Sequence, residues 1–135
     1  YGLAGLRVGY ALVPESWADA YARVNTPFAA SELACHAALA ALDDDDHLER
    51  SVESARWARE YLRDALETRT WESGANFVLA EVGDAGAVAE RAKERGVIVR
   101  DCTSFGLPEC VRVSCGTRET TRQAAETLND VLSEV

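Results

Sequence analysis

The sequence predicts an α/β fold of the α+β kind, in which a small sheet of about three strands is covered by helices. Three short apolar, β-prone runs, at 76–82, 97–101 and 110–115, are typical of strands. From residue 76 the predicted order is strand, helix, strand, strand, helix. Because a short loop joins the last two strands, we expect them to pair antiparallel, with the helices on one face of the sheet.

The first 42 residues predict one strand and two helices. Residues 7–13 (RVGYALV) are apolar and β-prone and precede Pro14, so we expect a strand that ends there. Residues 15–24 have a helical pattern, which the sequence NTP then interrupts. Residues 31–42 are rich in alanine, and Ser31 is a suitable N-terminal cap for a helix.

A long amphipathic helix is predicted over 47–66, where apolar residues recur at steps of three and four. It follows the acidic loop 43–46, and we expect Asp46 to cap it. A loop at 71–75 then leads into the first strand of the sheet.

The remaining segments surround the other two strands. A helix is predicted over 84–95, with Gly96 at the left-handed position that follows a helix. Residues 104–109 read as a loop, and Gly116-Thr117 opens a last helix.

The amino-acid composition limits the classes of protein to which the chain can belong. The 135 residues, 47% of them apolar, are enough for a domain with its own core, and no apolar run is long enough to span a bilayer. The net charge is −9, so nucleic acid is an unfavourable partner. Thirteen arginines accompany one lysine, Lys93, and this acidic, lysine-poor composition resembles that of proteins from salt-loving organisms.

The four cysteines predict neither a metal site nor a disulfide framework. Cys35, Cys102, Cys110 and Cys115 form no C-x-x-C pair, and the odd spacing of the last two places them on opposite faces of a strand. We expect four reduced, partly buried thiols in a cytoplasmic protein.

Three arginines stand among apolar residues. Arg7 follows Leu6, Arg100 ends the run VIV, and Arg112 lies between two valines. A guanidinium at the edge of a core is costly unless a partner neutralises it, and its planar fork suits a carboxylate or phosphate. Each arginine could pair with one of the 23 acidic residues of the chain. Three of them, two on adjacent predicted strands, favour an anion-binding site.

The opening residues, YGLAGLRVGY, resemble the segment after the cofactor lysine in fold-type I pyridoxal phosphate enzymes, most closely the histidinol-phosphate aminotransferases. That family's pattern is Ser-Lys-x-aromatic-Gly-Leu-Ala-Gly-Leu-Arg-x-Gly, and this chain begins at the aromatic position. ANFVLAEV at 75–82, GVIVRD at 96–101 and CVRVSCGTRE at 110–119 resemble the family's C-terminal domain in the same order.

The resemblance implies that residues 1–24 are the tail of the large cofactor-binding domain with a connecting helix, and that 25–135 are the small C-terminal domain. It implies pyridoxal 5'-phosphate as cofactor, with Arg7 binding its phosphate and Arg100 and Arg112 binding the substrate's anionic group. It also implies transfer of the amino group of histidinol phosphate to 2-oxoglutarate in histidine biosynthesis, by a cytoplasmic homodimer.

The catalytic residue that the resemblance implies is a Schiff-base lysine two residues before Tyr1. Lys93 lies in AERAKERG, on a predicted solvated helix face, without the surrounding motif. We therefore expect the chain alone to be inactive.

Other functions remain open from the residues. Related enzymes with the same cofactor, a threonine-phosphate decarboxylase or an aromatic amino acid aminotransferase, share the anion-binding arginines. A non-catalytic acidic binding or assembly module would instead have its arginines paired internally. His36 and His47 suit packing or capping, the four aspartates suit a solvated turn, and Ser104 and Ser114 have no histidine placed to activate them. The role of Asn76 is not assigned.

Overall fold

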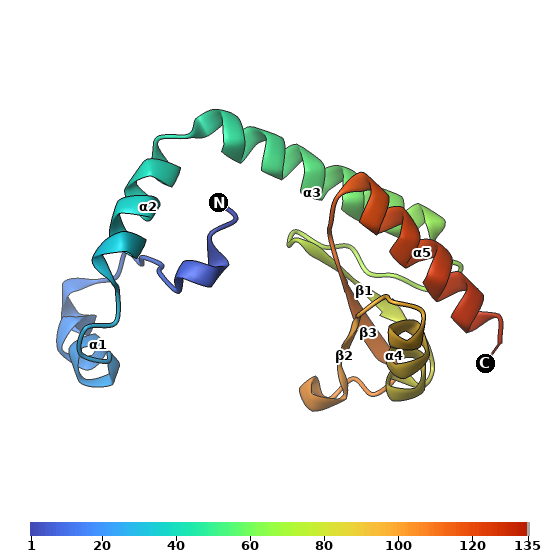
Figure 1. Ribbon diagram of the computed structural model, residues 1–135. Coiled ribbons are helices and arrows are strands. Elements are labelled where there is room, and N and C mark those ends of the chain that lie inside the picture. The colour runs from blue at the N-terminus through green and yellow to red at the C-terminus, as the bar shows by residue number, and fades with distance from the viewer. Residues whose placement is uncertain (135) are drawn as a thin grey trace. The chain divides into compact units, whose positions relative to one another are not determined.

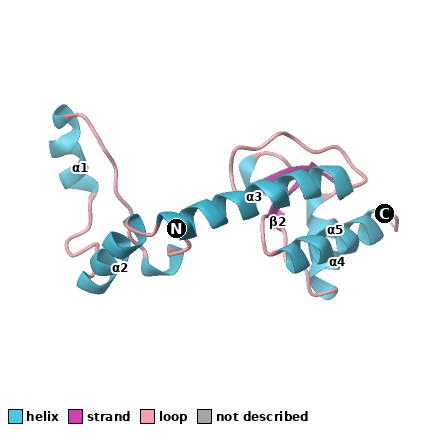
Figure 2. Ribbon diagram, turned by 90° about the horizontal axis from the view of Figure 1, so that it is seen from above, coloured by secondary structure: helices cyan, strands magenta, loops and turns pink. Residues whose placement is uncertain are grey.

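The computed structural model describes residues 1–134, which fall into two compact units. The first unit is Tyr1–Arg50 and the second begins at Ser51. This division differs from the predicted domain boundary after residue 24, which stays a prediction about the whole protein. Helices make up most of the regular structure (Figure 2). Among the described residues, no helix combines the length and the apolar character needed to cross a membrane.

The helices of the first unit confirm two predictions. Two short 3-10 helices, Ala4–Leu6 and Glu15–Trp17, precede α1 (Ala18–Val24) and α2 (Glu32–Leu42). Together the second 3-10 helix and α1 account for the helix predicted over 15–24. Ser31 caps α2 as expected, because its hydroxyl oxygen accepts a hydrogen bond from the Ala34 N–H at 3.1 Å.

Two expectations for the first unit are wrong. Residues 7–13 form no strand: in the described part of the chain no segment pairs with them, and a strand needs a neighbour for its backbone hydrogen bonds. The helix α3 (Asp45–Ala65) begins before the predicted residue 47, and Asp44 rather than Asp46 caps it by accepting from the His47 N–H at 3.0 Å. Four consecutive aspartates offer equivalent caps, so the pattern alone does not select one.

The sheet of the second unit has the predicted size and pairing. Its strands are β1 (Phe77–Glu81), β2 (Arg100–Asp101) and β3 (Cys110–Ser114), in the order β1-β3-β2, and β3 is antiparallel to both neighbours. The strand predicted at 97–101 is shortened to two residues. Its first residue, Val97, instead donates its N–H to the Ala92 carbonyl at 2.9 Å, which closes the preceding helix.

Helices cover one face of this sheet, as predicted. The helices on this face are the C-terminal half of α3, α4 (Ala85–Glu94) and α5 (Arg118–Leu132) (Figure 1). A single core joins the sheet to these helices; its buried members include Leu62, Val88, Leu128, Val131, Val78, Ala80, Val111 and Val113. Each such valine or leucine contributes about 1.5–3 kcal/mol on burial. Because side chains alternate along a strand, Leu79 and Arg112 lie on the opposite face.

The ends of α4 and α5 follow the sequence signals. Asp84 caps α4 by accepting from the Ala87 N–H at 2.9 Å, and Thr117 caps α5 by accepting from the Thr120 N–H at 3.2 Å. Gly96 has a φ of 82°, the left-handed conformation that follows a helix. A Cβ at Gly116 would meet the Thr120 hydroxyl, so a larger residue there would require the Thr120 side chain to shift.

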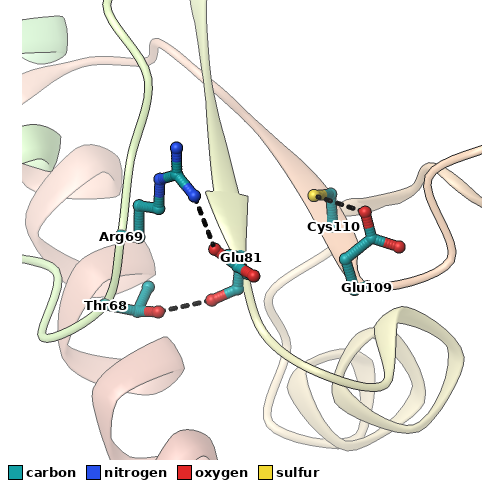
Figure 3. A network of polar contacts seen from close by, with 5 residues as sticks. All are labelled: Thr68, Arg69, Glu81, Glu109 and Cys110. Atoms are coloured by element: carbon teal, nitrogen blue, oxygen red, sulfur yellow. Dashed lines mark hydrogen bonds and ion pairs between the residues drawn. The ribbon is translucent and has the colours of Figure 1, made fainter.

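A segment that the sequence did not predict as β structure covers the free edge of β1. Thr70 forms an isolated bridge with Ala80, and the Glu81 N–H donates to the Arg69 carbonyl at 2.9 Å. Side chains reinforce this edge: the Thr68 hydroxyl donates to the Glu81 carbonyl, and Arg69 Nη1 lies 3.7 Å from Glu81 Oε2 (Figure 3). The edge is thereby protected from pairing with another chain.

Candidate anion-binding site

Two of the three predicted site residues are direct neighbours in the sheet. Arg100 of β2 pairs with Arg112 of β3, and Leu79 of β1 lies on the other side of Arg112. The two arginines therefore lie side by side on the face of the sheet that the helices leave uncovered. Like charges directly opposite each other in a sheet are destabilising, so this pair costs stability unless something offsets it.

The side chain of Arg112 is half-buried and rests on an aromatic ring. Its guanidinium carbon lies 5.1 Å from the centre of the Phe77 ring, and its Nε atom is buried without a hydrogen-bond partner in residues 1–134. A buried donor without a partner costs about 1–3 kcal/mol. Arg112 thus has a desolvated Nε donor, while its side chain as a whole is only half-buried.

Arg100 is more exposed but has a similar environment. Its guanidinium carbon lies 5.4 Å from the centre of the Phe105 ring, and Nη2 makes a long contact of 3.5 Å with the Ser104 hydroxyl. The adjacent Asp101 carboxylate accepts from the Thr103 N–H at 2.7 Å. Hydrogen bonds from Thr103, and secondarily the charge of Arg100, hold the pKa of Asp101 below its ordinary value.

Neither arginine of the pair is neutralised by a carboxylate. Within residues 1–134, the acidic groups in ion-pair contact with an arginine are Glu81, which pairs with Arg69, and Glu134, which pairs with Arg95 at 2.5 Å. A non-catalytic module was expected to have its arginines paired with acidic residues of the chain. Arg100 and Arg112 do not meet that expectation. The strands place together two positive charges that form no ion pair within residues 1–134, although Asp101 lies close enough to Arg100 to sense its charge. This arrangement suits a doubly charged anion.

Arg7 lies in the first unit and has a different setting. It follows the 3-10 helix Ala4–Leu6 with a φ of 54°, and its Nη1 donates to the Ala4 carbonyl at 3.0 Å. Its side chain lines an open hollow of about 580 Å³ together with Asn25 and Thr26. No carboxylate in the described residues forms an ion pair with Arg7.

The thiols nearest the arginine pair are poor nucleophiles. Cys102 and Cys110 are buried and lie opposite each other, with the Cys102 N–H donating to the Cys110 carbonyl at 3.1 Å. Burial, followed by the charges of Glu109 and Glu81, raises the pKa of Cys110, whose thiol contacts Glu109 Oε1 at 3.9 Å (Figure 3). Burial also raises the pKa of Cys115.

The other candidate side chains lie in ordinary surface settings. Lys93 Nζ is 3.2 Å from both carboxylate oxygens of Glu90 on the exposed side of α4. His36 Nε2 lies 3.8 Å from Glu32 on α2. In the part of the chain that the structure describes, no three His, Cys, Asp or Glu side chains are placed to hold a metal ion.

Sequence reasoning missed the aromatic contacts of the arginines. Phe77 and Phe105 attracted no functional interpretation, since their proximity to Arg112 and Arg100 depends on the strand register and on the turn after β2. A second cluster was missed as well: Arg118 lies 4.4 Å and Arg122 5.9 Å from the centre of the Trp57 ring. Arg122 also lies 6.0 Å from the centre of the Tyr61 ring.

The sequence and the fold belong to a known class of protein. The family model for aminotransferase class I and II matches residues 1–128, and the chain belongs to that family. The family assignment confirms the resemblance inferred from YGLAGLRVGY and CVRVSCGTRE.

Particular relatives narrow the comparison. The chain is 72% identical over 135 residues to a histidinol-phosphate aminotransferase of Haloferax volcanii and 69% identical to one of Haloarcula marismortui. Both matches cover 100% of this chain, but they cover only 37% of the Haloferax protein and 38% of the Haloarcula protein. A crystal structure of histidinol-phosphate aminotransferase from Sinorhizobium meliloti with pyridoxal-5'-phosphate superimposes with a TM-score of 0.87 at 27% identity, covering 99% of this chain and 39% of that one.

Proposed function

We propose that the protein containing this chain is a pyridoxal-phosphate-dependent aminotransferase. It converts histidinol phosphate and 2-oxoglutarate into imidazole acetol phosphate and glutamate, a step of histidine biosynthesis. The high identity to histidinol-phosphate aminotransferases over the whole chain supports this proposal. The activity concerns the whole protein, since the chain spans less than two fifths of those relatives.

The observation that carries the proposal is the uncompensated pair of arginines. Arg112 and Arg100 are cross-strand neighbours without an ion pair in residues 1–134. In our proposal their forks bind the phosphate of histidinol phosphate in the first half-reaction. In the second half-reaction they bind a carboxylate of 2-oxoglutarate, since a guanidinium fork fits both anions.

Arg7 is proposed to hold the phosphate of the cofactor. The residues that line the hollow fit such a group, because Arg7, Asn25 and Thr26 all carry side-chain hydrogen-bond donors. The backbone of Arg7 has a positive φ, a conformation that costs a residue with a side chain about 1–2 kcal/mol. Such strained residues are common at ligand-binding sites. When bound, pyridoxal phosphate supplies the electron sink for amino-group transfer.

Lys93 is not proposed as the cofactor lysine. Its ammonium group is exposed and already engaged by Glu90, whereas a Schiff-base lysine needs a desolvated position next to the cofactor. The family pattern instead places that lysine two positions before the aromatic residue matched by Tyr1. We therefore propose that residues 1–135 alone do not catalyse transamination.

The setting of the enzyme is part of the proposal. We propose a homodimer in the cytoplasm, where the four cysteines would stay reduced. The net charge of −9 supports the proposal that the enzyme functions at high salt, because salt screens the repulsion among surface carboxylates.

The test is an assay of the full-length enzyme with histidinol phosphate and 2-oxoglutarate. We expect glutamate to form in a one-to-one ratio with imidazole acetol phosphate. Release of carbon dioxide from threonine phosphate, with no glutamate formed from histidinol phosphate, would refute the proposal.

A further inference from the structure

Each arginine of the candidate site rests on a phenylalanine ring instead of on a carboxylate. Arg112 lies 5.1 Å from the Phe77 ring centre and Arg100 lies 5.4 Å from the Phe105 ring centre. Elsewhere in the second unit, Arg69 also lies over a ring, that of Trp71 at 4.8 Å, but it is paired with Glu81. Arg118 and Arg122 lie over the Trp57 ring and, within residues 1–134, also form no ion pair. Arg100 and Arg112 are set apart because they combine these two features with direct cross-strand pairing.

The chemical difference between the two kinds of partner is charge. A carboxylate would fix a guanidinium but would also neutralise it and compete with an anionic substrate. The face of an aromatic ring attracts the cation through its quadrupole and leaves the net charge and the N–H donors available. A ring can therefore orient an arginine without lowering its attraction for a phosphate.

The strand geometry shows how Phe77 reaches Arg112. Phe77 pairs with Ser114 and Leu79 pairs with Arg112, so Phe77 lies one diagonal step from Arg112 on the uncovered face of the sheet. Leu79 and Phe77 line the side of Arg112 that faces β1. The Nε atom of Arg112 is buried.

We propose that Phe77 and Phe105 are positioning residues, which hold the guanidiniums of Arg112 and Arg100 ready for the substrate's anionic group. The inference rests on the proposed function and adds two residues to its binding site. Phe77 has the larger role, because Arg112 is half-buried and cation–π attraction strengthens when the cation is desolvated. Phe105 is 61% exposed, so its effect is smaller.

The experiment compares single variants of the full-length enzyme by steady-state kinetics with histidinol phosphate. We expect Phe77→Leu to raise the KM for histidinol phosphate about threefold to fivefold and Phe105→Leu about twofold, with kcat nearly unchanged. Phe77→Tyr keeps an aromatic face and should restore a KM close to that of the wild type. The matched control is Trp71→Leu, which removes a ring from Arg69, outside the site, and should leave the KM unchanged.

The outcomes separate this inference from the proposed function. An unchanged KM in Phe77→Leu, together with a raised KM in Arg112→Ala, overturns the positioning role and leaves the function standing. An unchanged KM in Arg112→Ala overturns the binding role of Arg112, whereas a wild-type enzyme that forms no glutamate from histidinol phosphate overturns the proposed function itself. Equal rises in Phe77→Leu and Trp71→Leu, or failure of Phe77→Tyr to restore binding, also overturn the inference, because they would indicate a general loss of packing.

Discussion

Replacing Arg112 by leucine separates binding from stability at the candidate site. Arg112→Leu removes the guanidinium but keeps an apolar side chain beside Leu79 and Phe77. A hydrogen bond to a charged group contributes about 1.5–3 kcal/mol, so losing the contacts with the substrate phosphate should raise the KM for histidinol phosphate about 10-fold to 100-fold.

The stability of the folded enzyme should not fall in the same variant. The substitution removes a cation–π contact that contributes about 1 kcal/mol. It also relieves the repulsion from Arg100, about 0.2–1 kcal/mol, and eliminates the buried Nε donor without a partner, about 1–3 kcal/mol. The gains outweigh the loss, so the free energy of unfolding is expected to stay the same or to rise by up to about 3 kcal/mol.

The assay pairs steady-state kinetics with chemical unfolding of the full-length enzyme. Arg69→Leu is the control, since Arg69 lies over a ring as Arg112 does but is paired with Glu81. It should leave the KM unchanged. The reasoning is refuted if Arg112→Leu keeps the wild-type KM while the free energy of unfolding drops by more than about 3 kcal/mol, because Arg112 would then be a structural residue.

Three further predictions concern the rest of the chain. At neutral pH, Cys110 should resist alkylation until the protein unfolds, because it is buried and its pKa is raised, and alkylation of Cys110 in the native state would contradict this. The hydrogen bond from Arg95 lowers the pKa of Glu134. The pair's contribution to stability is therefore present above the ordinary pKa of a glutamate and is lost as pH falls through the lowered value. Urea unfolding between pH 7 and pH 2 should accordingly show a smaller loss of stability with acid in Glu134→Gln than in the wild type. Residues 1–135 mixed with pyridoxal phosphate should give no stable absorbance band of a lysine Schiff base, and a stable band that disappears in Lys93→Arg would show that the role of Lys93 was misjudged.

Local signals were sufficient for most of the second unit. The Thr117 cap and the alternation of valines in β3 act over a few residues, and they predicted elements that the structure confirms, as Ser31 did in the first unit. The family resemblance could also be recognised from the sequence, because it rested on continuous motifs. The strand predicted at 7–13 failed because pairing is a property of two segments, and no described segment pairs with this one.

The details of the candidate site depended on contacts that the sequence does not encode locally. That Arg100 and Arg112 lie on adjacent strands was predictable, but their direct opposition depends on the register of β2 against β3. The ring contacts of Phe77 and Phe105 depend on the same register and on the turn at 103–105. From the sequence alone, a phenylalanine next to valine-rich strands is interpreted as a residue of the hydrophobic core.

The most direct test of an uncompensated arginine pair is a comparison of histidinol phosphate with histidinol, its analogue without the phosphate, in the wild-type full-length enzyme and in Arg112→Ala. We predict that the wild type has a much higher kcat/KM for the phosphorylated substrate and that this preference falls at least about 10-fold in the variant. An equal preference for the phosphate in both enzymes would show that Arg112 does not bind it.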